Sequence, residues 1–155
     1  MPDLKLIALD DEDLSVISAH LQDAVVRVGD MTFIAREKRF AAVANRFDWA
    51  KALVGNGGRG KTDGLERRRT GLRFERVLAA RFQGLDLKDK SAALALLAIT
   101  FAPRNATEPV DGDVTLTFSG GAAIRLEVEC LEAEMKDLGA AWSANRAPAH
   151  PETKS

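Results

Sequence analysis

The stretch from Ala24 to Trp49 constrains the fold more than any other part of this chain, because it has the composition and spacing of antiparallel strands. β-Branched, aromatic and small apolar residues fill three short runs, and Gly29-Asp30 and Glu37-Lys38 separate these runs as tight turns would. The stretch therefore predicts three strands in succession, the last ending near Phe47. Both faces of these strands carry apolar side chains, so we expect both faces to be partly covered.

A short strand and a helix are predicted before this stretch. The apolar run from Leu4 to Leu9 is typical of an edge strand. Asp10 has the position of a helix N-cap, and the acidic residues after it suit the positive end of a helix dipole. Apolar residues three and four positions apart then form one stripe of a helix that we expect to end near Gln22; they are Leu14, Ile17 and Leu21.

The second half of the chain is predicted to add four strands. They cover residues 72–82, 92–101, 113–118 and 122–130, with a turn at Ser119-Gly120-Gly121. The run 92–101 also has the composition of a buried helix, and we favour the strand. At Cys130-Leu131 the alternation changes phase, which indicates either a bulge or a helix over residues 131–138; the helix propensity of that segment favours the helix.

These elements predict an α+β fold with about seven mainly antiparallel strands in a curved sheet or barrel. An N-terminal helix and, in the favoured interpretation, a C-terminal helix accompany the sheet, and a pleckstrin-like arrangement would fit. We expect residues 1–142 to form a single domain, residues 55–66 within it to be a flexible glycine-rich loop, and residues 143–155 to be a disordered tail.

The composition of the chain indicates the cellular compartment in which the protein works. A net charge of -1 excludes a uniformly basic protein that coats nucleic acid. Cys130 is the only cysteine, so no disulfide can form within the chain, which fits a reducing cytoplasm. No segment approaches the ~20 apolar residues of a membrane span. We therefore expect a bacterial cytoplasmic protein.

One motif, GNGGRGKT at residues 55–62, matches the P-loop pattern letter by letter. A P-loop must follow a buried parallel strand and open a helix, whose amides bind phosphate. Here no clear core strand precedes the motif, and Asp63-Gly64 is a poor helix start. The alternative function, a small-molecule or nucleotide-handling enzyme, depends on this motif and its Lys61, and we favour a loop without that activity.

A basic segment suggests a binding surface. Between Arg59 and Arg81 the chain has eight basic and three acidic residues, a net charge of +5. Such a segment can hold nucleic acid or an acidic protein. The predicted partner-binding residues are Arg67, Arg68, Arg69, Arg73 and Arg76. The alternative, which we favour for this segment taken by itself, is a solvated strand face balanced by Glu127, Glu129, Glu132 and Glu134.

No residues in the sequence form a recognisable catalytic or metal-binding set. His20 and His150 lack partners at metal-ligand spacing, and Cys130 has no histidine near it in sequence. We therefore expect no catalytic residues, no metal and no cofactor, and predict a non-enzymatic binding or accessory module for an anionic or protein partner. A homodimer that pairs exposed strand edges is a further possibility for the assembly.

Several segments resemble one known family. They are LKLIALDDEDLSVISAHLQDAVVRVGDM, RFAAVANRFDW, LRFERV, LLAITF and GAAIRLEVECLEAEMKDLGAAW. These segments resemble the alphaproteobacterial domain-of-unknown-function family 2948, and the resemblance covers the chain apart from the glycine-rich loop and the tail. It implies a small bacterial cytoplasmic protein without assigned activity, and it supplies no catalytic or binding residues.

Overall fold

The computed structural model describes residues 4–47, 66–138 and 142–143. The strands are β1 (Lys5–Ala8), β2 (Val25–Ile34), β3 (Arg39–Phe47), β4 (Glu66–Phe74), β5 (Val77–Gln83), β6 (Ala93–Pro103), β7 (Gly112–Phe118), β8 (Ala123–Val128), β9 (Ala133–Asp137) and β10 (Trp142–Ser143). The helices are α1 (Asp11–His20) and two short 3₁₀ turns, η1 (Ala35–Glu37) and η2 (Ser119–Gly121).

The predicted α+β class is confirmed, with more strands than expected. The predicted 55–66 loop, apart from Glu66, and the predicted tail beyond Ser143 lie outside the described residues.

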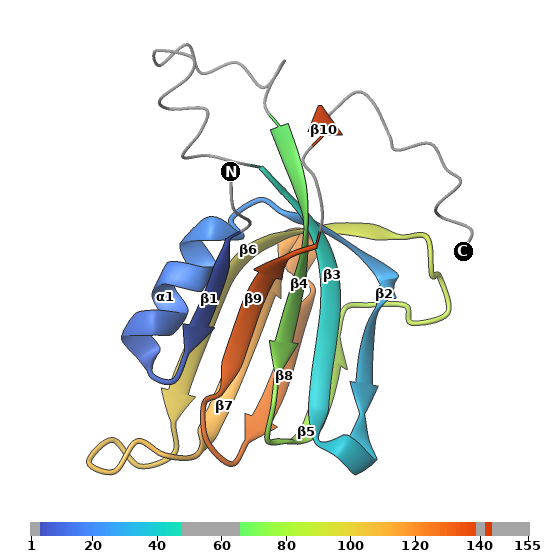
Figure 1. Ribbon diagram of the computed structural model, residues 1–155. Coiled ribbons are helices and arrows are strands. Elements are labelled where there is room, and N and C mark those ends of the chain that lie inside the picture. The colour runs from blue at the N-terminus through green and yellow to red at the C-terminus, as the bar shows by residue number, and fades with distance from the viewer. Residues whose placement is uncertain (1–3, 48–65, 139–141, 144–155) are drawn as a thin grey trace.

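Antiparallel pairing joins the strands into one curled sheet with the order β1-β9-β4-β3-β2-β6-β7-β8-β5, and β10 pairs with β4. Figure 1 shows β1, β9, β4, β3 and β2 in one layer, here called the front sheet, and β6, β7, β8 and β5 in the layer behind, here called the back sheet. The two layers meet where Val25–Arg27 of β2 pair with Ala93–Ala95 of β6. The core lies between the layers, and β1 and β5 are the edges at which the predicted homodimer would form.

Helix α1 closes the side of the molecule between β1 and β6 (Figure 1). Its start follows the prediction, since the Asp10 carboxylate accepts a hydrogen bond from Asp13 N at 2.8 Å. The predicted stripe of Leu14, Ile17 and Leu21 is completely buried. The hydroxyl of Ser18 accepts a hydrogen bond from Ile99 N of β6 at 2.9 Å. The helix thereby satisfies a backbone group on the side of β6 that faces away from β7, beyond the residues Ala93–Ala95 that pair with β2.

Replacing Ser18 by alanine is expected to lower the free energy of unfolding by about 1–2 kcal/mol, because it leaves the part-buried Ile99 N–H without a partner. Ser15→Ala is the matched control, since the Ser15 hydroxyl bonds only the carbonyl of Glu12 on the exposed side of the same helix. Urea denaturation of both variants measures the difference. An equal loss in both would show that the bond to β6 contributes nothing specific.

The predicted turn at Gly29-Asp30 is wrong, because β2 runs without reversal from Val25 to Ile34. The strand instead contains a bulge, seen as a register shift against β3 between Val26 and Met31. Gly29 N donates to Lys90 O at 2.9 Å, and a Cβ at Gly29 would lie 3.0 Å from that oxygen. The glycine therefore marks a close approach between backbones, which sequence alone does not distinguish from a turn.

The single strand predicted over residues 72–82 is also corrected, since it is interrupted at Glu75-Arg76. Arg76 has a φ of +62°, in the left-handed region. The Arg76 carbonyl accepts from Glu129 N, and Val77 N donates to Lys38 O, both at 2.9 Å. These bonds hold the corner at which the chain passes from the front sheet to the back sheet.

The helix favoured over residues 131–138 is wrong as well, because Ala133–Asp137 form strand β9. Two neighbours fix it there, with Leu6 of β1 and Leu72 of β4 both opposite Met135. Ala133, Met135 and Asp137 point into the core, and Glu134 and Lys136 point outward. Pairing on both sides outweighs the helix propensity of the segment.

Candidate binding face

Strand β4 carries four of the five predicted arginines, and strand alternation divides them between two faces. Its inward positions, all buried, are Arg68, Thr70, Leu72 and Phe74. Its outward positions are Arg67, Arg69, Gly71 and Arg73. The structure therefore places Arg68 inside the molecule, where it is 9% exposed. The other three arginines of β4 lie on the outer face of the front sheet.

Arg68 belongs to a buried cluster around the carboxylate of Asp137, which is 2% exposed. Arg46 of β3 holds that carboxylate with both prongs of its guanidinium, at 3.1 and 2.9 Å. Thr70 Oγ1 donates to the same carboxylate at 2.9 Å and Leu4 N at 3.1 Å. Arg68 Nε lies 4.0 Å away. The cluster joins the ends of β3, β4 and β9 within the core.

The pKa of the Asp137 carboxyl follows from these contacts. Burial disfavours the charged form, but the hydrogen bonds from Arg46 and Thr70 and the positive charge of Arg46 outweigh it and lower the pKa below its ordinary value. Asp137 is therefore ionised at neutral pH. Because its partners come from several strands, the cluster acts in the structure of the sheet and not on its surface.

Two of the outward or exposed arginines are neutralised by carboxylates. Arg73 makes an ion pair with Glu134 and another with Glu75 at 3.3 Å, and Arg76 lies 3.7 Å from Glu132. Partial burial works against ionisation of Glu134, yet the hydrogen bond from Lys5 and the charge of Arg73 lower its pKa. The balancing predicted for Glu132 and Glu134 is thus seen at Arg73 and Arg76.

On strands β4 and β9, three outward cations make no ion pair with a carboxylate of the described residues: Arg67, Arg69 and Lys136. The guanidinium of Arg67 lies over the ring of Phe47, 4.8 Å from its centroid, and its Nε is buried without a hydrogen-bond partner in the described part of the chain. Arg69 and Lys136 are exposed. Sequence reasoning missed Lys136 because it assigned a helix to its segment; alternation through Ala133–Asp137 would have placed it on the outer face.

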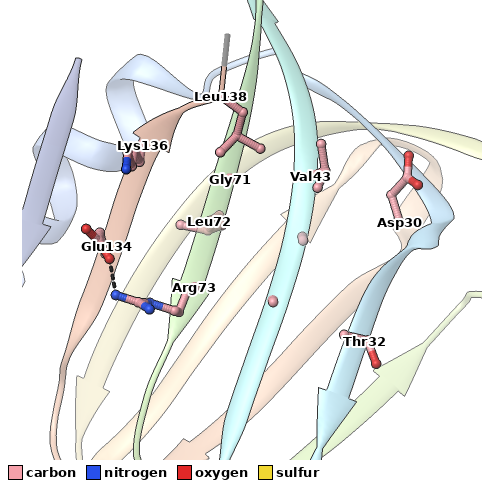
Figure 2. Close-up of a pocket in the computed structure, with 11 residues that line it drawn as sticks. Asp30, Thr32, Val43, Gly71, Leu72, Arg73, Glu134, Lys136 and Leu138 are labelled. Carbon is pink, nitrogen blue, oxygen red and sulfur yellow. Dashed lines mark hydrogen bonds and ion pairs between the residues drawn. The ribbon is translucent and has the colours of Figure 1, made fainter. Parts of the chain in front are cut away.

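A shallow groove of about 340 Å³ crosses the front sheet beside these cations. Its floor is made by small or apolar residues: Ala41 and Val43 of β3, Gly71 of β4, and Leu138, which follows β9. Figure 2 shows Lys136 on the β9 side of the groove and Asp30 on the β2 side, with Gly71 and Val43 between them. The floor can take apolar groups, and its two ends carry opposite charges.

The other residues considered from sequence add no second site. Cys130 is half-buried, and His20 ends α1. Within the described ranges, no three His, Cys, Asp or Glu side chains gather closely enough to hold a metal ion. The motif at residues 55–62, with Lys61, lies outside those ranges. None of the described helices has the length and apolar character needed to cross a membrane.

The comparisons with known proteins agree with the resemblance seen in the sequence. A family model described as "Protein of unknown function (DUF2948)" matches residues 4–150, nearly the whole chain. Neither the curated proteins nor the solved structures gave a match. No role is thereby attached to any residue, so function has to be argued from the geometry of this chain.

Proposed function

Because this chain belongs to the DUF2948 family, whose description assigns no activity, we propose its function from its own surface: it is a non-enzymatic binding module that recognises an anionic partner. The outer face of the front sheet is the binding surface. The contacts are made by Arg67, Arg69 and Lys136. The single cysteine, Cys130, suits a reducing compartment, so we place the module in the bacterial cytoplasm.

The observation that carries this proposal is the difference between paired and unpaired cations. Arg73 and Arg76 have carboxylates within ion-pair distance, whereas Arg67, Arg69 and Lys136 have none among the described residues. Strand alternation presents Arg67 and Arg69 on the same side of β4, and Lys136 lies directly opposite Gly71 on the adjacent strand. Glu134 lies near enough to Lys136 for the two charges to interact, but no described carboxylate makes an ion pair with any of these three cations. An anion that approaches this face therefore meets positive charge that is not held in an ion pair.

Charge reversal of Arg67 and Arg69 tests the proposal. We expect the double variant Arg67→Glu/Arg69→Glu to bind immobilised polyglutamate at least ~10-fold more weakly than the wild type at low salt, since two attractive contacts become repulsive. Arg81→Glu/Arg125→Glu is the matched control. These two residues lie opposite each other on the neighbouring strands β5 and β8, and both are exposed on the back sheet. Their reversal changes the net charge by the same amount as that of Arg67 and Arg69.

Retention of the chain as a function of salt concentration is the measurement. If both double variants lose binding equally, only net charge matters and the proposed face is wrong. If neither loses binding, the anionic partner is not held by this face. Running the same series on immobilised single-stranded RNA compares the two kinds of polyanion on identical variants.

A further inference from the structure

We propose that the groove on the front sheet binds an extended segment of a partner protein that lies across the strands, with an acidic side chain at Lys136 and a basic side chain at Asp30. This inference rests on the proposed function, because Lys136 belongs to the proposed binding surface, and it names the class of the partner as a protein. It follows from the floor of the groove, the charges at its ends and its length.

The floor of the groove has the chemistry of a site for small apolar side chains. Val43 of β3 and Lys136 of β9 are the two neighbours of Gly71 in the sheet, so the missing side chain of Gly71 leaves a depression between them. The side chain of Leu138 packs into one side of this depression, 3.4 Å from the position of an added Gly71 Cβ, and it is still 48% exposed although it is a large apolar residue. A partner that covered Leu138 and the depression would remove apolar surface from water.

The ends of the groove carry charges that the described residues leave unpaired. Lys136 and Asp30 lie on opposite sides of the depression in Figure 2, and neither has an ion pair within the described ranges. Arg73 and Glu134 at the rim are bonded to each other and contribute little net charge. One end of the groove is therefore positive and the other negative, which fits a ligand with separated opposite charges.

The length of the groove matches that of a short extended peptide. It crosses the four neighbouring strands β9, β4, β3 and β2, which is three strand spacings, or about 14 Å. An extended chain of about five residues covers this distance. A nucleic acid fits less well, because its phosphates are spaced evenly and would bring negative charge beside Asp30. The occupant is therefore a protein segment with an acidic and a basic residue separated by small apolar ones.

Titration of the full isotope-labelled chain with the capped peptide Asp-Ala-Val-Ala-Lys tests the inference by nuclear magnetic resonance. We expect shifts in the amide signals of Val43, Gly71 and Lys136, and affinity ~10-fold higher than for the same peptide with Asn and Gln at its ends. Asp30→Lys should reverse the preference, so that Asp-Ala-Val-Ala-Asp binds better. Glu108→Lys is the control, since it makes the same charge change in the exposed connection between β6 and β7.

Gly71→Val provides a second variant whose readout does not depend on charge. It fills the floor of the groove, and peptide binding should be lost while the thermal midpoint of unfolding stays within a few degrees of the wild type.

Equal binding of charged and neutral peptides, or an unchanged preference in Asp30→Lys, overturns the inference. Stronger shifts of the same amides with a single-stranded oligonucleotide would overturn the assignment to a protein partner. If the groove gives no shifts while Arg67→Glu/Arg69→Glu still weakens polyglutamate binding, only this inference fails; if both are silent, the proposed function fails with it.

Discussion

Replacing Asp137 by alanine is expected to lower the free energy of unfolding by about 3–5 kcal/mol, the cost of leaving a buried cation without its partner. Arg46 is 4% exposed and directs both prongs of its guanidinium at Asp137, so the substitution removes its carboxylate from an interior site. Thr70 Oγ1 and Leu4 N lose their acceptor at the same time. Urea denaturation at neutral pH measures the loss.

Asp111→Ala is the control for this prediction. Asp111 accepts from Arg104 at 3.0 Å, but both side chains are about half exposed, and the expected loss is below about 1 kcal/mol. A similar loss in the two variants would contradict the argument that burial makes the Asp137 cluster important.

The same cluster predicts a pH dependence. Because the pKa of Asp137 is lower in the folded than in the unfolded chain, its ionisation stabilises the fold above the unfolded pKa, near 4. This contribution is lost as the pH falls from there through the folded pKa. The stability difference between the wild type and Asp137→Asn should therefore be constant near neutral pH and shrink in acid. A difference that grew in acid would show that the sign is wrong.

Replacing Gly112 by alanine is the second large expected effect, a loss of about 3 kcal/mol in the free energy of unfolding. Gly112 begins β7 opposite Pro103 of β6 and is buried. An added Cβ would lie 2.3 Å from Ala102 O and 2.7 Å from Pro103 Cα. Both are backbone atoms, so the methyl group can be accommodated only if β6 and β7 move apart.

Gly71→Ala is the matched control, since its added Cβ would meet the flexible end of Leu138 at 3.4 Å, an ordinary contact. Its free energy of unfolding should change by less than about 0.5 kcal/mol. Thermal unfolding of both variants measures the contrast. Equal midpoints would show that the β6–β7 pair yields easily at Gly112.

The local signals in the sequence predicted much of the fold. Asp10 and the apolar stripe of α1 gave the helix, and clean alternation gave β7 and β8 with the turn between them. These elements could be predicted because their causes lie within a few residues: a capping carboxylate, a period of three to four, a period of two. The same signals failed at Gly29, at Arg76 and over residues 131–138, where distant strands decide the local conformation.

The candidate face could be predicted only in part. Sequence pointed to the basic segment around Arg67, but it treated Arg67, Arg68 and Arg69 as one patch. Strand alternation puts Arg68 against Asp137, 69 residues further along the chain, and its two neighbours outside. Lys136 and the groove could not be foreseen, because both depend on β9 lying beside β4.

The sequence by itself determined the α+β class, the helix between β1 and β2, and the periodic strands, since each follows from the properties of neighbouring residues. Only the tertiary structure decided where strands bend, which arginines are buried, and which cations remain unpaired. Those outcomes depend on which strands become neighbours. On the same strand, Arg68 is a core residue because it faces the interior and the carboxylate of Asp137, whereas Arg69 is a surface residue because it faces solvent.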